Sequence, residues 1–287
     1  MITTVIVSPQ EVAEGKLTSE NLGTAVSAIQ RDGCVVLQDI IDLEHIRILR
    51  EKMMEDVALF TGRKDAPFNF NRGNVQQDPP PFPPYLFKDV LLNELVIQVT
   101  KTVLGAGVKS NFYSGNTAIK SDLRQPVHVD VGQLWSGMEV ASPTFGIVVN
   151  VPVVDVSAEN GSTELWLRTH LNPSVSIHDP KINIPEETLE SARQAGYQPI
   201  QADVKAGSAV LRDIRLWHAG VPNHTDTPRP MIAMIHWCRW MESGDVLRFP
   251  VGTEEFFKHP DLKTQAVFTA EPIDYIQAPH AYDFEDK

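Results

Sequence analysis

The sequence predicts a single domain in which helices wrap a β-barrel or β-sandwich core. Three observations lead to this fold class: helical periodicity dominates residues 1–107, short strand-like runs dominate from residue 108, and no repeat or linker divides the 287 residues. One all-β barrel or sandwich can use a chain of this length. We therefore expect one domain over 1–287, with a helical wrapping and lid loop (1–107), a β core (108–245) and a C-terminal extension (246–287).

The first part of the chain is expected to run helix, strand, helix. Apolar side chains recur at helical spacing through residues 19–33, and Gly33 is typical of a helix stop. The apolar run Cys34–Leu37 follows as a buried strand. Asp42 is a suitable N-cap for a second helix, whose apolar face extends over residues 43–57.

A long loop is predicted next. Residues 61–86 are rich in Gly, Asn, Asp and Pro, with a proline-rich run at 79–84, and this composition excludes a helix or a central strand. Because loops of this length inside compact domains are usually functional, we interpret this one as an ordered loop or a lid. Helical spacing returns over residues 87–104 and stops at Gly105.

The remainder of the chain has β character. Strand-like runs occur at 110–119, 144–153, 161–167, 209–217 and 230–240. A helix is expected to interrupt them at 186–195, and the tail beyond Pro250 gives only weak signals.

Composition limits the partners of the protein. With 25 basic and 37 acidic residues the net charge is −12, which repels nucleic acid and anionic lipid, and no basic patch offsets it. No apolar run approaches the roughly 18 residues that cross a bilayer. Cys34 and Cys238 lie in apolar segments and are expected to be buried free thiols in a reducing compartment. We expect a cytoplasmic protein with a small-molecule substrate. Its composition is compatible with a monomer or a homodimer.

Three residues have the types and positions of a metal site. His128 and Asp130 are two residues apart, so in a strand they lie on the same face and can share one ion. His218, at the predicted end of a strand, is the strongest third candidate. Two histidines and one carboxylate that leave the opposite side of the ion open suit non-haem Fe(II) oxygenases. Arg229, which opens the last predicted strand, offers a guanidinium that can bind a carboxylate bidentately.

These residues stand in stretches that resemble the phytanoyl-CoA dioxygenase family of Fe(II)- and 2-oxoglutarate-dependent oxygenases, more closely its members from fungal and bacterial natural-product pathways. The matching stretches, in order, are 33–37, 89–93, 104–105, 115–116, 125–130, 159–164, 217–220 and 229–230. The resemblance implies a double-stranded β-helix, a cupin-like jelly roll with helices packed on one sheet. That fold agrees with the β-rich second half of the sequence.

The resemblance also implies roles for single residues. Iron is assigned to His128, Asp130 and His218. The implied cosubstrates are 2-oxoglutarate and dioxygen. The residues assigned to 2-oxoglutarate are Arg229, for the distal carboxylate, with Gln125, Arg72 and Thr163. No separate acid or base is implied. One departure from the family pattern is the stretch 166–170, where relatives commonly carry a Pro-Gly turn.

The expected function is oxidation of an unactivated C–H bond of a small, largely apolar metabolite in secondary-metabolite biosynthesis, by hydroxylation, desaturation or rearrangement. A CoA thioester is disfavoured because its phosphates would require basic residues. Two alternatives are a cupin-type metal enzyme that does not use 2-oxoglutarate and a non-catalytic partner subunit of the same fold. Aromatic candidates for the substrate pocket are Phe68, Phe70, Trp135 and Trp217.

Overall fold

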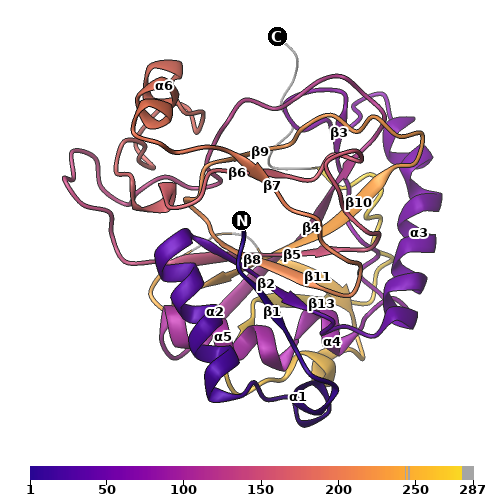
Figure 1. The fold of residues 1–287 in the computed structure, drawn as a ribbon. Coiled ribbons are helices and arrows are strands. Elements are labelled where there is room, and N and C mark those ends of the chain that lie inside the picture. Colours follow the sequence, from indigo (N-terminus) through magenta and orange to yellow (C-terminus); the bar gives the residue numbers. More distant parts are fainter. Residues whose placement is uncertain (243, 245, 280–287) are drawn as a thin grey trace.

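The computed structural model describes residues 1–242, 244 and 246–279, so residues 280–287 of the expected C-terminal extension lie outside the described part (Figure 1). The helices are α1 (Pro9–Glu14), α2 (Ser19–Asp32), α3 (Leu43–Thr61), α4 (Lys88–Leu91), α5 (Glu94–Leu104) and α6 (Glu186–Gln194). The strands are β1 (Thr4–Ile6), β2 (Cys34–Gln38), β3 (Asn74–Gln76), β4 (Val108–Ala118), β5 (Gly146–Pro152), β6 (Glu164–Leu165), β7 (Ile200–Gln201), β8 (Ala209–Asp213), β9 (His218–Ala219), β10 (Arg229–Trp237), β11 (Leu247–Pro250), β12 (Leu262–Thr264) and β13 (Ala266–Thr269).

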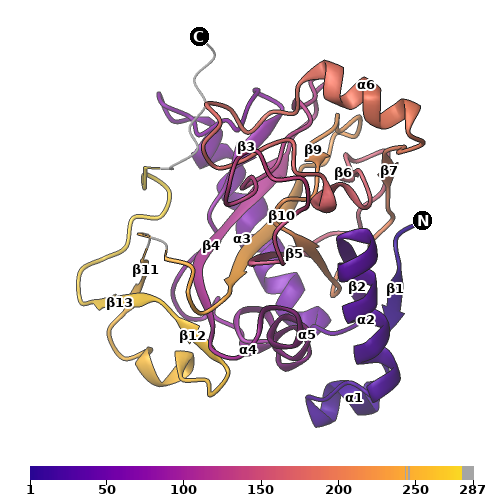
Figure 2. The same ribbon diagram turned by 90° about the vertical axis from the view of Figure 1, so that its left-hand side faces the viewer.

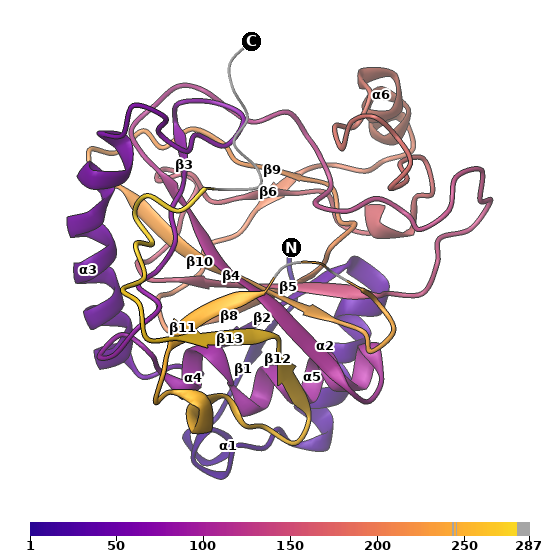
Figure 3. The ribbon, with the colours of Figure 1, turned by 180° about the vertical axis from the view of Figure 1, so that it is seen from behind.

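Two sheets face each other, as a jelly roll requires. The main sheet has the order β1-β2-β8-β5-β10-β4-β12, with β3 also paired to β4, and the smaller sheet has the order β7-β6-β9. Figures 1 and 2 show the smaller sheet on one side of the main sheet and helices α1, α2, α4 and α5 on the other. Seen from behind, β11 and β13 form a separate pair beside α4 and β12 (Figure 3). The expected fold class, a jelly-roll core with helices on one sheet, is confirmed.

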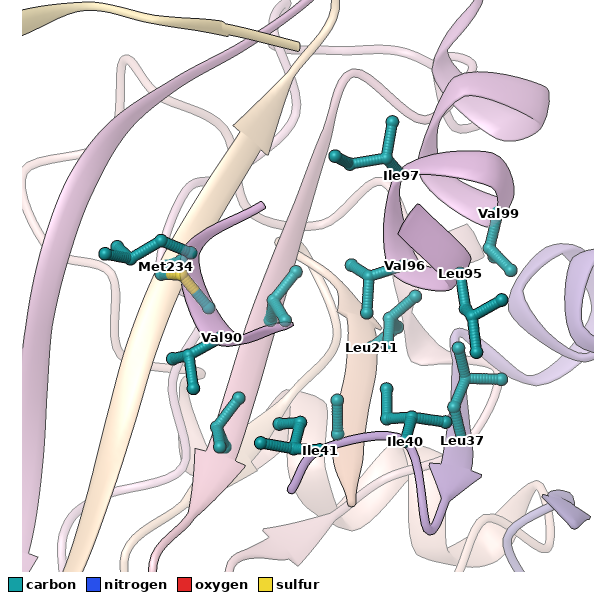
Figure 4. Close-up of a cluster of buried hydrophobic side chains, with 14 of the residues drawn as sticks. Leu37, Ile40, Ile41, Val90, Leu95, Val96, Ile97, Val99, Leu211 and Met234 are labelled. Carbon is teal, nitrogen blue, oxygen red and sulfur yellow. The ribbon is translucent and has the colours of Figure 1, made fainter. Parts of the chain in front are cut away.

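The helices cover the outer face of the main sheet through alternate side chains of its strands. Leu37, Leu211 and Met234 come from three different strands and share one buried cluster with Val96 and Ile97 of α5 (Figure 4). Because successive side chains of a strand point to opposite faces, the residues between them face the interior of the jelly roll. The burial of the outer face thus determines which residues face inward.

Several predicted elements are confirmed and others need correction. The helix over 87–104 is interrupted, because Asn93 Oδ1 accepts hydrogen bonds from the backbone N–H groups of Leu95 and Val96 and so begins a new helix, α5. The strand expected over 209–217 ends at Asp213, whose Oδ1 accepts the backbone N–H of Arg215 and turns the chain. β1, α1 and β11–β13 were not predicted, because each has only three to six residues and carries little periodicity.

The expected lid loop contains a strand that belongs to the main sheet. β3 pairs with β4, and Val75 is fully buried. Gln77 is also fully buried, donating to the Met53 carbonyl at 2.7 Å and accepting from Thr117 Oγ1 at 2.6 Å. As predicted, the segment contains neither a helix nor a central strand, because β3 pairs with β4 alone, but this short strand packs the segment into the fold along part of its length.

Two predictions from composition can be compared with the structure. Cys34 and Cys238 are buried free cysteines, as expected. Within the described part of the chain, no helix is long and apolar enough to cross a bilayer.

His236 gives the fold a measurable dependence on pH. Its ring on β10 is buried, and Nδ1 lies 3.0 Å from Oγ1 of the buried Thr100 on α5. Burial lowers the pKa of His236 to about 4, with the charge of His259 adding to the shift, whereas an unfolded histidine titrates near pH 6.5. Protons therefore bind more tightly to the unfolded chain, and stability present above pH 6.5 is lost as the pH falls toward 4, by on the order of 3 kcal/mol.

We expect His236→Gln, which cannot titrate, to reduce the loss of unfolding free energy between pH 7 and pH 4.5 compared with the wild type. Urea unfolding at the two pH values measures this difference. Other buried histidines contribute equally to both proteins, and His224→Gln on the surface is the matched control. An identical loss in wild type and His236→Gln would show that His236 does not carry this dependence.

Candidate metal centre

A cavity of about 870 Å³, measured with its open mouth, lies between the inner face of the main sheet and the segments that cover it. It is lined by six of the seven predicted site residues: His128, Asp130, His218, Gln125, Thr163 and Arg229. The floor comes from alternate residues of the central strands, among them Val148 of β5 and Ala233 of β10. Residues predicted from separate motifs of the sequence thus meet around one cavity.

Backbone hydrogen bonds hold the two histidines together. The N–H of His128 donates to the His218 carbonyl at 2.9 Å, and the N–H of His218 donates to the His128 carbonyl at 3.0 Å. The next residues continue this pairing, because Val129 N–H donates to the Ile182 carbonyl and Asp130 N–H to that of Ile214. The segment around His128 is therefore hydrogen-bonded on both sides, although it does not form a regular strand.

The alternation of side chains holds even without a regular strand. Val127 and Val129 are buried in a cluster with Trp217, whereas His128 and Asp130 face the cavity. His218 is also placed differently from the prediction, since it begins the short strand β9 after a turn instead of ending β8. The side chains of His128, Asp130 and His218 nevertheless converge, as expected.

The three side chains offer one ligand atom each, and these atoms lie within 4.8 Å of one another. His218 Nε2 is 3.4 Å from Asp130 Oδ1. The other ring nitrogen of each histidine is occupied, because Nδ1 of His128 and of His218 lies 2.8 and 2.9 Å from the carbonyls of Pro126 and Leu216. A ring that donates from Nδ1 to a carbonyl keeps its Nε2 lone pair free, which orients both rings for a metal.

Electrostatics keep the centre in its metal-binding protonation state. Burial lowers the pKa of His128 to about 3, and the neighbouring His218 contributes in the same direction. His128 is therefore neutral at pH 7. Burial alone would favour the protonated form of Asp130, but the charge of Arg212 and the contact with His218 hold the pKa of this carboxyl well below its usual range. Neutral imidazole and ionised carboxylate are the forms that bind a divalent metal.

Arg212 of β8 is the residue that the sequence analysis missed. Its Nη2 lies 2.6 Å from Asp130 Oδ2, and its Nε donates to Asn150 Oδ1 at 3.2 Å. Because Oδ2 of Asp130 is occupied, Oδ1 is left beside His218 Nε2. A signal was present, since an arginine inside an apolar strand such as Ala209–Asp213 requires an acidic or ligand partner when it is buried.

Arg229 is a buried cation without an acidic partner among the described residues. It is 3% exposed, and Nη2 donates to the Gly161 carbonyl at 2.8 Å, while Nε and Nη1 have no partner. Burial lowers its pKa to about 10, and no neighbouring carboxylate offsets that shift. A buried guanidinium with unused donors fits an anionic ligand, so the cavity wall suits the distal carboxylate of 2-oxoglutarate.

Gln125 and Thr163 line the cavity, but Gln125 also has structural partners. Its Oε1 accepts the Gly220 N–H at 2.7 Å and its Nε2 donates to the Asn69 carbonyl at 3.2 Å. The amide thereby joins the loop before β3 to the residue two positions after His218. Thr163 is half-buried at the cavity wall.

Arg72 does not reach this cavity. Its side chain is exposed and it is absent from the residues that line the space. The chain turns earlier, at Phe70, which has a positive φ of 66° and whose ring centroid lies 4.5 Å from that of His128. Of the four aromatic candidates for the pocket, Phe70 alone lines it, whereas Trp135 is 55% exposed. Phe68 and Trp217 pack in other clusters.

We expect Arg212→Leu to weaken Mn(II) binding about 10- to 100-fold, because partners that orient a metal ligand typically have effects of this size. Loss of a nearby positive charge acts in the opposite direction, by increasing attraction for a cation, and we expect the loss of orientation to dominate. Arg212→Lys keeps the charge and should give an intermediate affinity.

Calorimetric titration of the metal-free protein measures these affinities. Arg124→Leu, which removes the surface ion pair with Glu164, is the matched control. Wild-type affinity in Arg212→Leu would remove the positioning role of Arg212.

The fold and the site together define a class of protein. A jelly roll that brings two histidines and a carboxylate to one side of a cavity has the ligand arrangement of the non-haem Fe(II) oxygenases. A family model described as phytanoyl-CoA dioxygenase (PhyH) matches residues 29–231. The chain therefore belongs to the phytanoyl-CoA dioxygenase family, whose enzymes use iron and 2-oxoglutarate, and it is an oxygenase-type enzyme of that class.

Solved structures with the same fold include three proteins that each match most of this chain. AviO1 from Streptomyces viridochromogenes Tue57 has a TM-score of 0.58 and 18% identity, over 79% of this chain and 99% of its own. The epimerase SnoN, in complex with Fe3+, alpha ketoglutarate and nogalamycin RO, has a TM-score of 0.57 and 14% identity, over 88% and 98%. HygX from Streptomyces hygroscopicus, with nickel, 2-oxoglutarate and hygromycin B bound, has a TM-score of 0.54 and 13% identity, over 86% and 97%.

Proposed function

We propose that this enzyme oxidises a C–H bond of a small metabolite in a natural-product pathway, with iron held by His128, Asp130 and His218 and 2-oxoglutarate held by Arg229. One observation carries the proposal: a triad whose two buried histidines keep their Nε2 lone pairs free shares its cavity with the buried guanidinium of Arg229, which has no carboxylate partner among the described residues. A metal and an anion are the two ligands that such a cavity requires.

Iron and 2-oxoglutarate, when bound, supply the activation of dioxygen and the oxidant for the C–H bond. The chain's own part is positioning. His128 and His218 present lone pairs whose direction is fixed by the Nδ1 hydrogen bonds, and Asp130 presents Oδ1 while Arg212 holds Oδ2. Arg229 fixes the far carboxylate of the cosubstrate, which sets the distance of its other end from the triad.

The alternatives explain less of the cavity. A cupin-type enzyme without 2-oxoglutarate would leave Arg229 buried beside empty acceptor positions, which is energetically costly. A non-catalytic subunit would have no chemical reason to keep three convergent ligands with both histidines oriented. Formation of succinate from 2-oxoglutarate in the presence of dioxygen separates the proposed function from both alternatives.

The substrate is proposed to be small and without net charge. No lysine lines the cavity in the described part of the chain, and its two arginines face Asp130 and the proposed cosubstrate position. The net charge of −12 likewise supports a small-molecule substrate over nucleic acid or a membrane surface. We also propose a cytoplasmic location for the enzyme, as a monomer or a homodimer. The small molecules bound to SnoN and HygX support a natural-product substrate. The proposed reaction on this substrate is hydroxylation, desaturation or rearrangement.

We expect His218→Ala and Asp130→Asn each to abolish 2-oxoglutarate-dependent succinate formation and to lower the iron content well below one ion per chain. The reason is that either change removes a third of the ligand set. Metal analysis and succinate assays measure the two effects, and His224→Ala, an exposed histidine, is the matched control. Near-normal activity in either triad variant would refute the ligand assignment.

We expect Arg229→Ala to weaken 2-oxoglutarate binding by about 2–5 kcal/mol, the typical loss when one partner of a buried charge pair is removed. Arg229→Lys should recover part of it, since an ammonium group cannot form the two-pronged contact. Anaerobic titration of the metal-loaded protein with 2-oxoglutarate gives the affinities. Arg72→Ala is the control and should bind like wild type; the opposite ranking of Arg72 and Arg229 would overturn the assignment.

A further inference from the structure

One wall of the cavity consists of neutral amide side chains. Gln76 of β3 and Asn116 of β4 are paired positions of the two strands. Asn69, from the loop before β3, contacts both: its Nδ2 lies 3.1 Å from Asn116 Oδ1 and 3.3 Å from Gln76 Oε1. We call these three side chains the amide wall.

A carboxylate fixes the direction of the hydrogen bonds in the amide wall. An ionised carboxylate only accepts, so Ser114 Oγ donates to Asp78 Oδ1. Ser114 Oγ then accepts from Gln76 Nε2 at 2.8 Å, and Gln76 Oε1 is left to accept from Asn69 Nδ2. The amide of Asn69 is therefore oriented with its NH₂ group toward Gln76 and Asn116, and its Oδ1 is left without a hydrogen bond.

Every other polar group of Asn69 is occupied. Its backbone N–H donates to the Asn74 carbonyl at 2.8 Å, and its own carbonyl accepts from Gln125 Nε2 at 3.2 Å. Both N–H groups of Nδ2 have acceptors, whereas Oδ1 is buried without a partner. Because the residue is fixed at four points, its unpaired oxygen is not the result of a loose side chain. A fixed, desolvated acceptor is complementary to a donor that a ligand brings.

Asn69, which carries the unpaired oxygen, is followed in the sequence by Phe70, a residue at the metal centre. Phe70 lines the cavity, and its ring centroid is 4.5 Å from that of His128. A flat, apolar molecule that contacts the Phe70 ring in the cavity would thus lie near both Asn69 and the proposed iron ligands. The same turn of the chain provides both an apolar surface and a polar anchor.

We infer that Asn69 Oδ1 selects the substrate by accepting a hydrogen bond from it. The substrate class is a neutral metabolite with an apolar ring body and a hydroxyl or secondary amide as donor. This inference rests on the proposed function and refines it, because a wholly apolar substrate would leave the acceptor unpaired. The amide wall itself is uncharged, so a neutral donor matches it better than an ion.

The test uses matched probes that differ only in the donor. The probes are 2-naphthylmethanol and its methyl ether for O–H, and N-methyl-2-naphthamide and its N,N-dimethyl derivative for N–H. Dissociation constants are measured on the full chain loaded with Mn(II) and 2-oxoglutarate, from the paramagnetic relaxation of probe protons. We expect the donor probe of at least one pair to bind about tenfold tighter than its methylated partner.

Asn69→Ala should reduce this preference to less than about threefold while Mn(II) and 2-oxoglutarate affinities stay within about twofold of wild type. Asp78→Asn should also reduce the preference, because the direction of the hydrogen-bond chain is no longer fixed, and this effect is not expected from a merely structural role. Asn172→Ala, whose side chain caps a local turn, is the matched control.

The outcomes separate the two proposals. If the wild type binds neither Mn(II) nor 2-oxoglutarate, the proposed function fails. If it binds both but shows no preference for a donor probe, whether the probes bind equally or not at all, the role of Asn69 is refuted. An unchanged preference in Asn69→Ala has the same consequence.

Discussion

The reciprocal pair of backbone hydrogen bonds between His128 and His218 is the constraint on which the site depends. These bonds join two segments that are far apart in the sequence and bring their side chains to one side of the cavity. The orientation of each ring is then set locally, by the carbonyl two residues earlier in its own segment. Long-range pairing thus places the histidines, and short-range hydrogen bonds aim them.

Motifs that act through local geometry could be predicted from the sequence. The spacing of His128 and Asp130 places them on one face whether or not the segment forms a regular strand, so this prediction did not depend on the exact secondary structure. The helices could be predicted because their apolar faces and caps lie within a few residues of each other, as at Asp42. Arg229 could also be assigned to the start of a strand from local sequence, because the strand-like run begins at the next residue.

Features that depend on the path of a loop or on the register between strands could not be predicted. Arg72 was assigned by its position in a motif, but the turn at Phe70 brings Asn69 and Phe70 to the cavity instead. Arg212 meets Asp130 because the fold brings the segment of Asp130 beside the end of β8, and the sequence around Arg212 does not identify this distant partner. The interruption at Asn93 is an intermediate case, since a capping residue was visible within a continuous apolar pattern.

The two faces of the main sheet connect stability to chemistry. Leu211 lies in the buried cluster beneath the helices, and the next residue, Arg212, holds the carboxylate of the metal centre. A shift of β8 by one residue would bury Arg212 among apolar side chains and turn Leu211 toward the cavity. The apolar outer face therefore does more than stabilise the fold, because its burial enforces the register that presents the polar side chains of the inner face. In this molecule the hydrophobic core beneath the helices and the metal centre are specified by alternate residues of the same strands.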